Sequence, residues 1–134
     1  MAKNATFHCS LLTPERPVLE TEARFVAFPA HDGEMGVLRN RSPLVCKLGI
    51  GVLRIETDGT THRFFIDGGF AQVVENKLSI LTAQAREAKD VDAASAGKAL
   101  VEARSMKITD DASSAARSNA IQRAQVQLTL TRGG

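Results

Sequence analysis

The chain has 134 residues, enough for one domain or for one compact domain with an appendage. Its composition, 43% hydrophobic and 24% charged, is ordinary for a globular protein, and its net charge of +2 is too small to indicate nucleic-acid binding. No window approaches the roughly 18 apolar residues of a membrane span, and the N-terminus lacks the apolar core of a signal peptide. We therefore expect a soluble, cytoplasmic chain in which Cys9 and Cys46 stay reduced and bind no metal.

Short apolar runs alternate with turn signals up to about residue 81, a pattern that predicts strands. Alternate residues from Phe7 to Leu11 share one face of the first run. In the segment 21–28 the same alternation places Val26 and Phe28 on the face opposite Ala27. The predicted runs are 6–12, 18–19, 21–28, 43–48, 52–57, 62–66, 70–74 and 78–81.

Two turn signals divide the second half of this part: Asp58-Gly59 predicts a hairpin, and Asp67-Gly68-Gly69 predicts a further reversal. All six Phe residues lie at or before position 70, so we expect an N-terminal aromatic core. Strands joined by sequential turns pair mostly antiparallel. The expected fold class is therefore α+β by segregation: an N-terminal antiparallel β-sandwich of roughly eight to ten strands, then a C-terminal antiparallel two-helix hairpin.

The helices follow from a change of period near residue 82. Asp90 or Asp92 can cap the first helix, and Asp110 or Asp111 can cap the second. The two apolar stripes consist of Ala96, Ala99, Leu100 and Ala103, and of Ala116, Ala120, Ile121, Ala124 and Leu128.

Two helices of similar length with a short connection form a hairpin. We therefore divide the chain into a β domain, residues 1–86, and a helical hairpin, residues 87–134. Because alanine buries little apolar area, we expect the hairpin to dock weakly on the β domain and to be able to move.

The segment from Phe28 to Val45 joins two strand runs but holds few strand-pattern residues. It breaks at Pro29, turns at Asp32-Gly33 and places Glu34-Met35 at an exposed tip between two glycines. The residues leave two interpretations open: a long connection between strands, or a loop that presents an acid and an apolar side chain to a partner.

Motifs for catalysis are not found in the sequence. It holds no phosphate-binding loop, no dinucleotide fingerprint and no serine-nucleophile elbow. His8, His31 and His62 have no paired acid at motif spacing, and Asp32 with Glu34 fits solvated loop charges better than a catalytic pair. We therefore expect no active site, metal or cofactor, and these patterns leave open a free-standing β-sandwich module that binds a ligand or a protein.

An ordered set of motifs covers nearly the whole chain. It consists of Gly-Glu-Met-Gly-Val-Leu (33–38), Ser-Pro-Leu-Val (42–45), Gly-Val-Leu-Arg-Ile (51–55), Asp-Gly-Gly-Phe-Ala-Gln-Val (67–73), Leu-Ser-Ile-Leu-Thr (78–82) and Ala-x-x-Val-Asp (88–92), before an Ala-rich end. In order and spacing this set resembles the ε subunit of F-type ATP synthase. The resemblance implies an N-terminal β-sandwich, a C-terminal helical hairpin and a place in the central rotor, with no active site of its own.

The resemblance also implies partners and a location. The β domain would bind the γ subunit and the ring of membrane-embedded c subunits, and so couple them during ATP synthesis driven by H⁺ or Na⁺. The hairpin would move between a folded-down form and an extended form that meets the α and β subunits and inhibits ATP hydrolysis. The chain would lie at the cytoplasmic face of the bacterial inner membrane, attached only through the complex.

Residue roles are carried over by motif. Glu34 and Met35 would contact the polar loops of the c ring. Arg117 and Arg123, on the second helix, would meet an acidic segment of the β subunits. These two arginines lie roughly 120° apart around a helix, so one flat surface would not easily meet both.

One departure from the family lies in the rim after the first motif. Here Arg39-Asn40-Arg41-Ser42-Pro43 replaces a rigid Pro-Gly-His-x-Pro turn, which adds two positive charges. Arg39, Arg41 and Pro43 are therefore candidate rim contacts.

A second departure concerns nucleotide binding. Some members of the family bind ATP between the helices through Ile/Leu-Asp-x-x-Arg-Ala. Here Asp92 is retained, but Ser95 stands in place of the arginine, and Arg86 stands in place of an upstream acid. We therefore expect Asp92 to be a helix cap, and we do not expect ATP to bind at this place.

Overall fold

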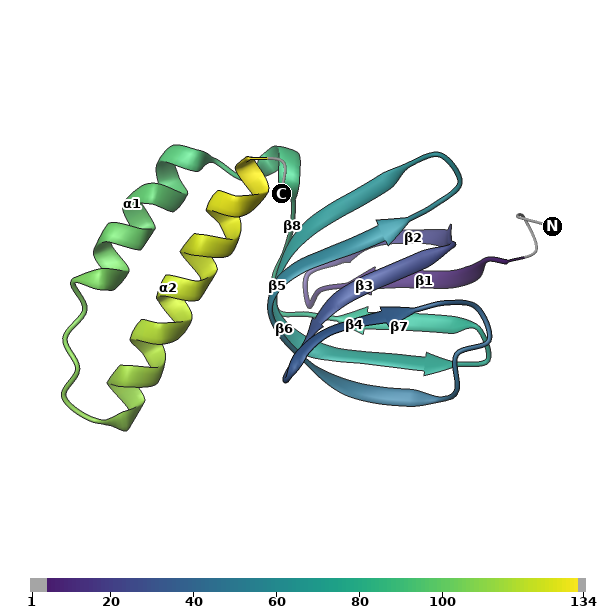
Figure 1. Ribbon diagram of the computed structural model, residues 1–134, viewed down its shortest axis with the longest axis horizontal. Coiled ribbons are helices and arrows are strands. Elements are labelled where there is room, and N and C mark those ends of the chain that lie inside the picture. The colour runs from purple at the N-terminus through teal and green to yellow at the C-terminus, as the bar shows by residue number, and fades with distance from the viewer. Residues whose placement is uncertain (1–4, 133–134) are drawn as a thin grey trace.

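The computed structural model describes residues 5–132 (Figure 1). A β-sandwich comes first, and two helices lie against one side of it. The strands are β1 (Phe7–Leu12), β2 (Pro17–Ala23), β3 (Phe25–Ala30), β4 (Gly33–Val37), β5 (Leu44–Glu56), β6 (Thr61–Val74), β7 (Lys77–Leu81) and β8 (Ala85–Glu87). The helices are the 3-10 helix η2 (Ala88–Asp90), α1 (Ala93–Arg104) and α2 (Asp111–Thr131). The predicted fold class, a mostly antiparallel β-sandwich followed by a helical hairpin, is confirmed.

The strands form one hydrogen-bonded sheet in the order β2-β1-β7-β6-β5-β3-β4, with β8 paired to β6. Neighbouring strands are antiparallel except β1 and β7, which are parallel. The longest strands, β5 with 13 residues and β6 with 14, run through the middle of the sheet. Because the sheet curves, side chains from β1 to β7 all reach one common core.

The core confirms the predicted alternation at the start of the chain. In β1, Phe7, Cys9 and Leu11 are buried and the residues between them are not. Cys9 is a free cysteine, and burial raises the pKa of its thiol to about 12. It therefore acts as a small apolar core residue.

The segment 21–28 is not one strand, because β2 ends at Ala23 and β3 begins at Phe25. Val26, Ala27 and Phe28 are all buried, but only Val26 and Phe28 belong to the main core, in keeping with the predicted division of these residues between two faces. Both faces of β3 are buried here, and a strand that is buried on both faces does not need to alternate apolar with polar residues.

A second correction concerns Asp67-Gly68-Gly69, where β6 continues instead of reversing. Gly68 and Gly69 have φ angles of 72° and 111°, a region that glycine enters at little cost. Residues before this kink pair with β8, and residues after it pair with β7. Gly69 also lacks room for a side chain, since a Cβ would overlap the backbone carbonyl of Leu81. The glycines therefore bend one strand so that its halves serve different neighbours.

The helices form an antiparallel hairpin in which α2 lies between α1 and the sandwich (Figure 1). Asp92 caps α1 and Asp110 caps α2, one from each predicted pair. The expectation of similar lengths is wrong, because α1 has 12 residues and α2 has 21. The greater length of α2 places Leu130 against Phe65 of β6.

The docking surface of the hairpin also differs from the expectation. Ala99 and Ala116, which belong to the predicted stripes, are exposed. The contact with the β domain uses larger side chains instead, and its members are Phe65, Val91 and Leu130, with the half-buried Ile50, Val52, Ala88 and Val126 around them. The docking contact is therefore not made by the alanine stripes alone, and the weak docking and the mobility of the hairpin stay predictions.

The proposed division after residue 86 falls within β8, which ends at Glu87. Within residues 5–132, no helix combines the length and the apolar character needed to cross a membrane.

Candidate functional site

The Phe28–Val45 segment is a hairpin and a loop, not one long connection. Strands β3 and β4 pair from Val26–Val37 to Ala30–Gly33, and the exposed residues His31 and Asp32 form the turn between them. The exposed tip expected at Glu34-Met35 is therefore in the wrong place. The tip lies at His31-Asp32, because the residues from Gly33 onward already pair with β3.

Glu34 and Met35 lie on β4, which is an edge strand of the sheet. The Glu34 side chain is exposed, whereas Met35 is half-buried and packs against the core. Of the two proposed contact residues, Glu34 is thus the one that can reach a partner without rearrangement.

The loop from 38 to 43 joins β4 to β5. Arg39, Arg41 and Pro43 are all exposed in it. Asn40 adopts a left-handed conformation with φ of 67°, and its backbone N–H donates to Oδ1 of Asn76 at 2.6 Å. Asn76 Nδ2 donates back to Asn40 Oδ1 at 3.2 Å. The asparagine pair therefore ties the loop that carries the extra arginines to the β6–β7 turn.

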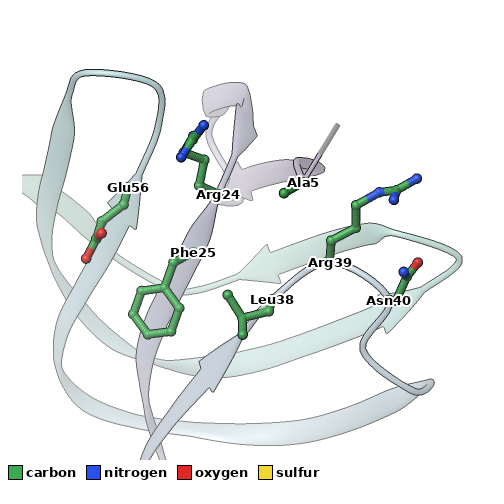
Figure 2. Close-up of a pocket in the computed structure, with 7 residues that line it drawn as sticks. All are labelled: Ala5, Arg24, Phe25, Leu38, Arg39, Asn40 and Glu56. Carbon is green, nitrogen blue, oxygen red and sulfur yellow. The ribbon is translucent and has the colours of Figure 1, made fainter. Parts of the chain in front are cut away.

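A surface depression of about 720 Å³ lies beside this loop (Figure 2). Its lining residues are Ala5, Arg24, Phe25, Leu38, Arg39, Asn40 and Glu56. Figure 2 shows Phe25 and Leu38 next to each other, with Glu56 to one side and Arg39 to the other.

Most of the charges around this depression are already paired. Asp58 Oδ1 lies 3.1 Å from Arg24 Nε, as an ion pair without hydrogen-bond geometry. Arg54 Nε donates to Glu56 Oε2 at 3.0 Å, and its guanidinium lies 5.5 Å from the centre of the Phe25 ring. Glu56 is therefore held by Arg54 beside the Phe25 ring.

Exposed apolar side chains lie among polar ones on the outer face of β5, β6 and β7, where Lys47 and Gln72 are the cross-strand partners of Phe70 and Val45. Phe70 is 56% exposed and Leu81 is 51% exposed, and the two are cross-strand partners. Val45 is 69% exposed and Val74 is 39% exposed, on the same face as Phe70. We call Val45, Phe70, Val74 and Leu81 the outer patch. The expected N-terminal aromatic core is present, with Phe7, Phe28 and Phe64, but Phe70 is not part of it.

The residues of the nucleotide motif lie at the start of the hairpin. Asp92 caps α1, accepting from Ser95 Oγ at 2.6 Å and from the backbone N–H groups of Ala94 and Ser95. These hydrogen bonds, above all the one from the Ser95 hydroxyl, lower the pKa of Asp92. Arg86 is exposed on β8, where it pairs with Phe65. The residue that replaces the family's arginine thus completes a helix cap.

Arg117 and Arg123 face different parts of the molecule, in agreement with their spacing on the helix. Arg117 Nη2 donates to the backbone carbonyl of Arg104 at 3.2 Å, at the C-terminus of α1. Arg123 Nε donates to Asp67 Oδ2 at 2.7 Å, across the contact with the β domain. Sequence reasoning missed Asp67, because the kink that places it was taken for a turn.

Among residues 5–132, no three His, Cys, Asp or Glu groups are arranged to hold a metal ion. The described part of the molecule also presents three exposed features: the β4 edge at Glu34, the outer patch and the arginines of α2.

Comparison with known proteins gives these surfaces a context. The family model for the ATP synthase delta/epsilon chain β-sandwich domain matches residues 6–88. The ATP synthase epsilon chain of Rhodopirellula baltica is 41% identical over 127 residues, which covers 95% of this chain and 99% of that protein. The ATP synthase epsilon chain of Desulfitobacterium hafniense is 41% identical over 101 residues, covering 74% of this chain and 76% of that one.

Solved structures agree. A chain in the mitochondrial ATP synthase of Euglena gracilis, in a structure of OSCP, F1 and the c-ring, matches with a TM-score of 0.82 and 27% identity, covering 90% of this chain and 78% of that chain. A chain in the central stalk and c-ring of the Tetrahymena thermophila mitochondrial ATP synthase matches with a TM-score of 0.74. At 16% identity, with 92% and 95% of the two chains covered, this second match shows the fold alone.

Proposed function

Because this chain belongs to the delta/epsilon family of ATP synthase and is a central-stalk subunit of F1, we propose that it couples the γ subunit to the c ring and regulates ATP hydrolysis. In this proposal it has no active site of its own. Its β domain holds the rotor parts together during ATP synthesis driven by H⁺ or Na⁺, and its hairpin restrains hydrolysis by contact with the α and β subunits. It lies at the cytoplasmic face of a bacterial membrane and is held there by the complex.

The outer patch is the observation that carries the coupling role. Exposed apolar side chains that gather on neighbouring strands mark a surface for a partner, and permanent interfaces are the more apolar ones. We assign the outer patch to the γ subunit, since this joint has to persist while the rotor turns. The exposed Glu34 edge, which is charged, suits the polar loops of the c ring, where complementary charge fixes register.

The assignment is tested with Phe70→Ser. Burying the exposed half of a Phe side chain contributes about 2 kcal/mol, so the variant is expected to bind γ about 30-fold more weakly. Val101→Ser is the matched control, since Val101 is an apolar residue of α1 that is 67% exposed. Both variants should unfold at nearly the wild-type temperature, because neither side chain is buried in this chain. Equal γ binding by the two variants would remove the outer patch from the interface.

The c-ring contact is tested in the assembled synthase with Glu34→Lys. We expect ATP synthesis driven by an ion gradient to fall severalfold, while ATP hydrolysis by detached F1 is retained. The same change at Glu15, an exposed residue of the β1–β2 turn, is the control. If Glu34→Lys synthesises ATP as well as Glu15→Lys, Glu34 does not contact the ring.

Regulation by the hairpin is supported by its arrangement. Within the described residues, α1 packs mainly on α2, and α2 makes the main helical contact with the sandwich. The hairpin can thus separate from the β domain along one surface. In a chain that ends after Glu87, ATP hydrolysis by the complex should rise, and unchanged hydrolysis would show that the hairpin does not restrain it.

A further inference from the structure

The ion pair between Arg123 and Asp67 joins the two parts of the protein. Its Nε–Oδ2 distance is 2.7 Å, and the side chains are 41% and 21% exposed. Of the ion pairs found within residues 5–132, it is the one that connects α2 to the sheet. Gln122 Nε2 donates to the carbonyl of Ile50 at 3.1 Å beside it. The polar part of the docking contact is thus concentrated on one turn of α2.

Asp67 is held in place by its surroundings. Its backbone N–H lies 3.3 Å from both the carbonyl of Gln84 and Oγ1 of Thr82. Thr82 is only 3% exposed, and its hydroxyl donates to the same Gln84 carbonyl at 3.1 Å. With Gly68 and Gly69 directly after it, Asp67 stands at a kink in β6 where these hydrogen bonds anchor its backbone. An acceptor that is already positioned loses little conformational freedom when an arginine binds it.

We propose that Asp67 is an intramolecular competitor for Arg123: in the docked hairpin it occupies the guanidinium that an acidic segment of a partner subunit binds when the hairpin extends. This inference rests on the proposed function, because it needs an extended state that restrains hydrolysis. The two contacts exclude each other, since α2 has to leave the β domain before a partner can take the place of β6. The same arginine therefore contributes to both states, and its intramolecular acid sets part of the balance between them.

The competition predicts opposite signs for two variants that break the same ion pair. Asp67→Asn keeps the shape of the side chain, removes the competing charge and leaves Arg123 for the partner, so inhibition of ATP hydrolysis should rise. Arg123→Gln loosens docking as well, but it also removes the group that binds the partner, so inhibition should fall. A purely structural ion pair would give the two variants the same sign.

Docking is measured on the full-length free chain by thiol labelling. Val91→Cys places a thiol in the buried contact with Leu130, and Cys46→Ser removes the more accessible native thiol, whereas Cys9 is fully buried in the other core. The labelling rate then reports how often the hairpin opens. Asp67→Asn and Arg123→Gln should each raise this rate about two- to fivefold, the range for a partly exposed ion pair. High salt should reduce the difference from wild type.

Controls separate this proposal from its premise. Asp58→Asn removes another paired carboxylate of the β domain, away from the hairpin, and should change neither labelling nor hydrolysis. The exchanged pair Asp67→Arg with Arg123→Asp should restore slow labelling without restoring inhibition. If truncation after Glu87 leaves hydrolysis unchanged, the proposed regulation fails. If truncation raises hydrolysis but Asp67→Asn and Arg123→Gln shift it in the same direction, or Asp67→Asn labels like Asp58→Asn, the competition is refuted.

Discussion

The kink in β6 depends on Gly69, and Gly69→Ala should be among the most damaging single changes in the β domain. Gly69 has a φ of 111°, where an alanine is strained. A Cβ at this position would also overlap the carbonyl of Leu81 and come within 2.8 Å of Thr82 Cα. Both obstacles are backbone atoms of a neighbouring segment, so no side-chain rotation can relieve the overlap.

The two effects can be given magnitudes. The left-handed backbone conformation costs an alanine about 1–2 kcal/mol. Separating β6 from β7 enough to admit a methyl group loses hydrogen bonds worth about 1 kcal/mol each, together with packing. A total of about 3–5 kcal/mol is expected, a large part of the roughly 5–15 kcal/mol that stabilises a typical domain.

Gly59→Ala is the matched control, because Gly59 has a φ of 90° and nothing within 4 Å of the added Cβ. It should lose only the conformational share of about 1–2 kcal/mol. Urea unfolding followed by circular dichroism gives both values, since the chain has no Trp or Tyr for fluorescence. Equal losses for the two variants would refute the close approach of β6 to β7.

Three further predictions concern the hairpin and the thiols. Gly97→Ala, in an open position of α1, should stabilise the hairpin by about 0.5–1 kcal/mol in thermal unfolding, and a loss would contradict this. Hydrogen bonds from the first turn of each helix lower the pKa of Asp92 and Asp110 below the ordinary 3.8, so these caps stabilise the helices above about pH 4. The helical circular dichroism signal should therefore decline as the pH falls below about 4, and it should decline less in Asp92→Asn. Cys46 should react with a thiol reagent in the native protein and Cys9 only after unfolding, and simultaneous reaction would contradict the burial of Cys9.

Local rules predicted those parts of the fold that local forces determine. The alternation in β1, the Asp58-Gly59 hairpin and the caps of both helices depend on residues that are close in sequence, and all three are present. Asp67-Gly68-Gly69 has the composition of a turn, yet it bends a strand. Pairing of β6 with two strands that follow later in the chain, β7 and β8, determines that the segment bends instead of reversing, and local sequence patterns do not reveal this pairing.

The candidate surfaces were harder to predict for a similar reason. Alternation shows which residues share a face of a strand, but it does not show which face the rest of the sheet covers. The positions of the Phe residues predicted an N-terminal aromatic core, yet Phe70 is 56% exposed. Met35 was placed at an exposed tip, although β4 turns it toward the core. In both cases the exposure of a side chain differs from what the sequence pattern indicated. Which face of a strand is buried depends on the curvature of the whole sheet.

The docking contact changes what is expected of the hairpin's motion. Alanine stripes alone would let the helices leave at little cost, but Leu130 and Val91 close over Phe65, and each fully buried side chain of this size contributes roughly 1.5–3 kcal/mol. That burial is lost on opening unless another surface replaces it. Opening should therefore be rare in the free chain and become common only where a partner covers the exposed face of α2. In the proposed exchange Arg123 gives up Asp67 for another acid, so the partner we propose has to supply both an apolar groove and a negative charge beside it.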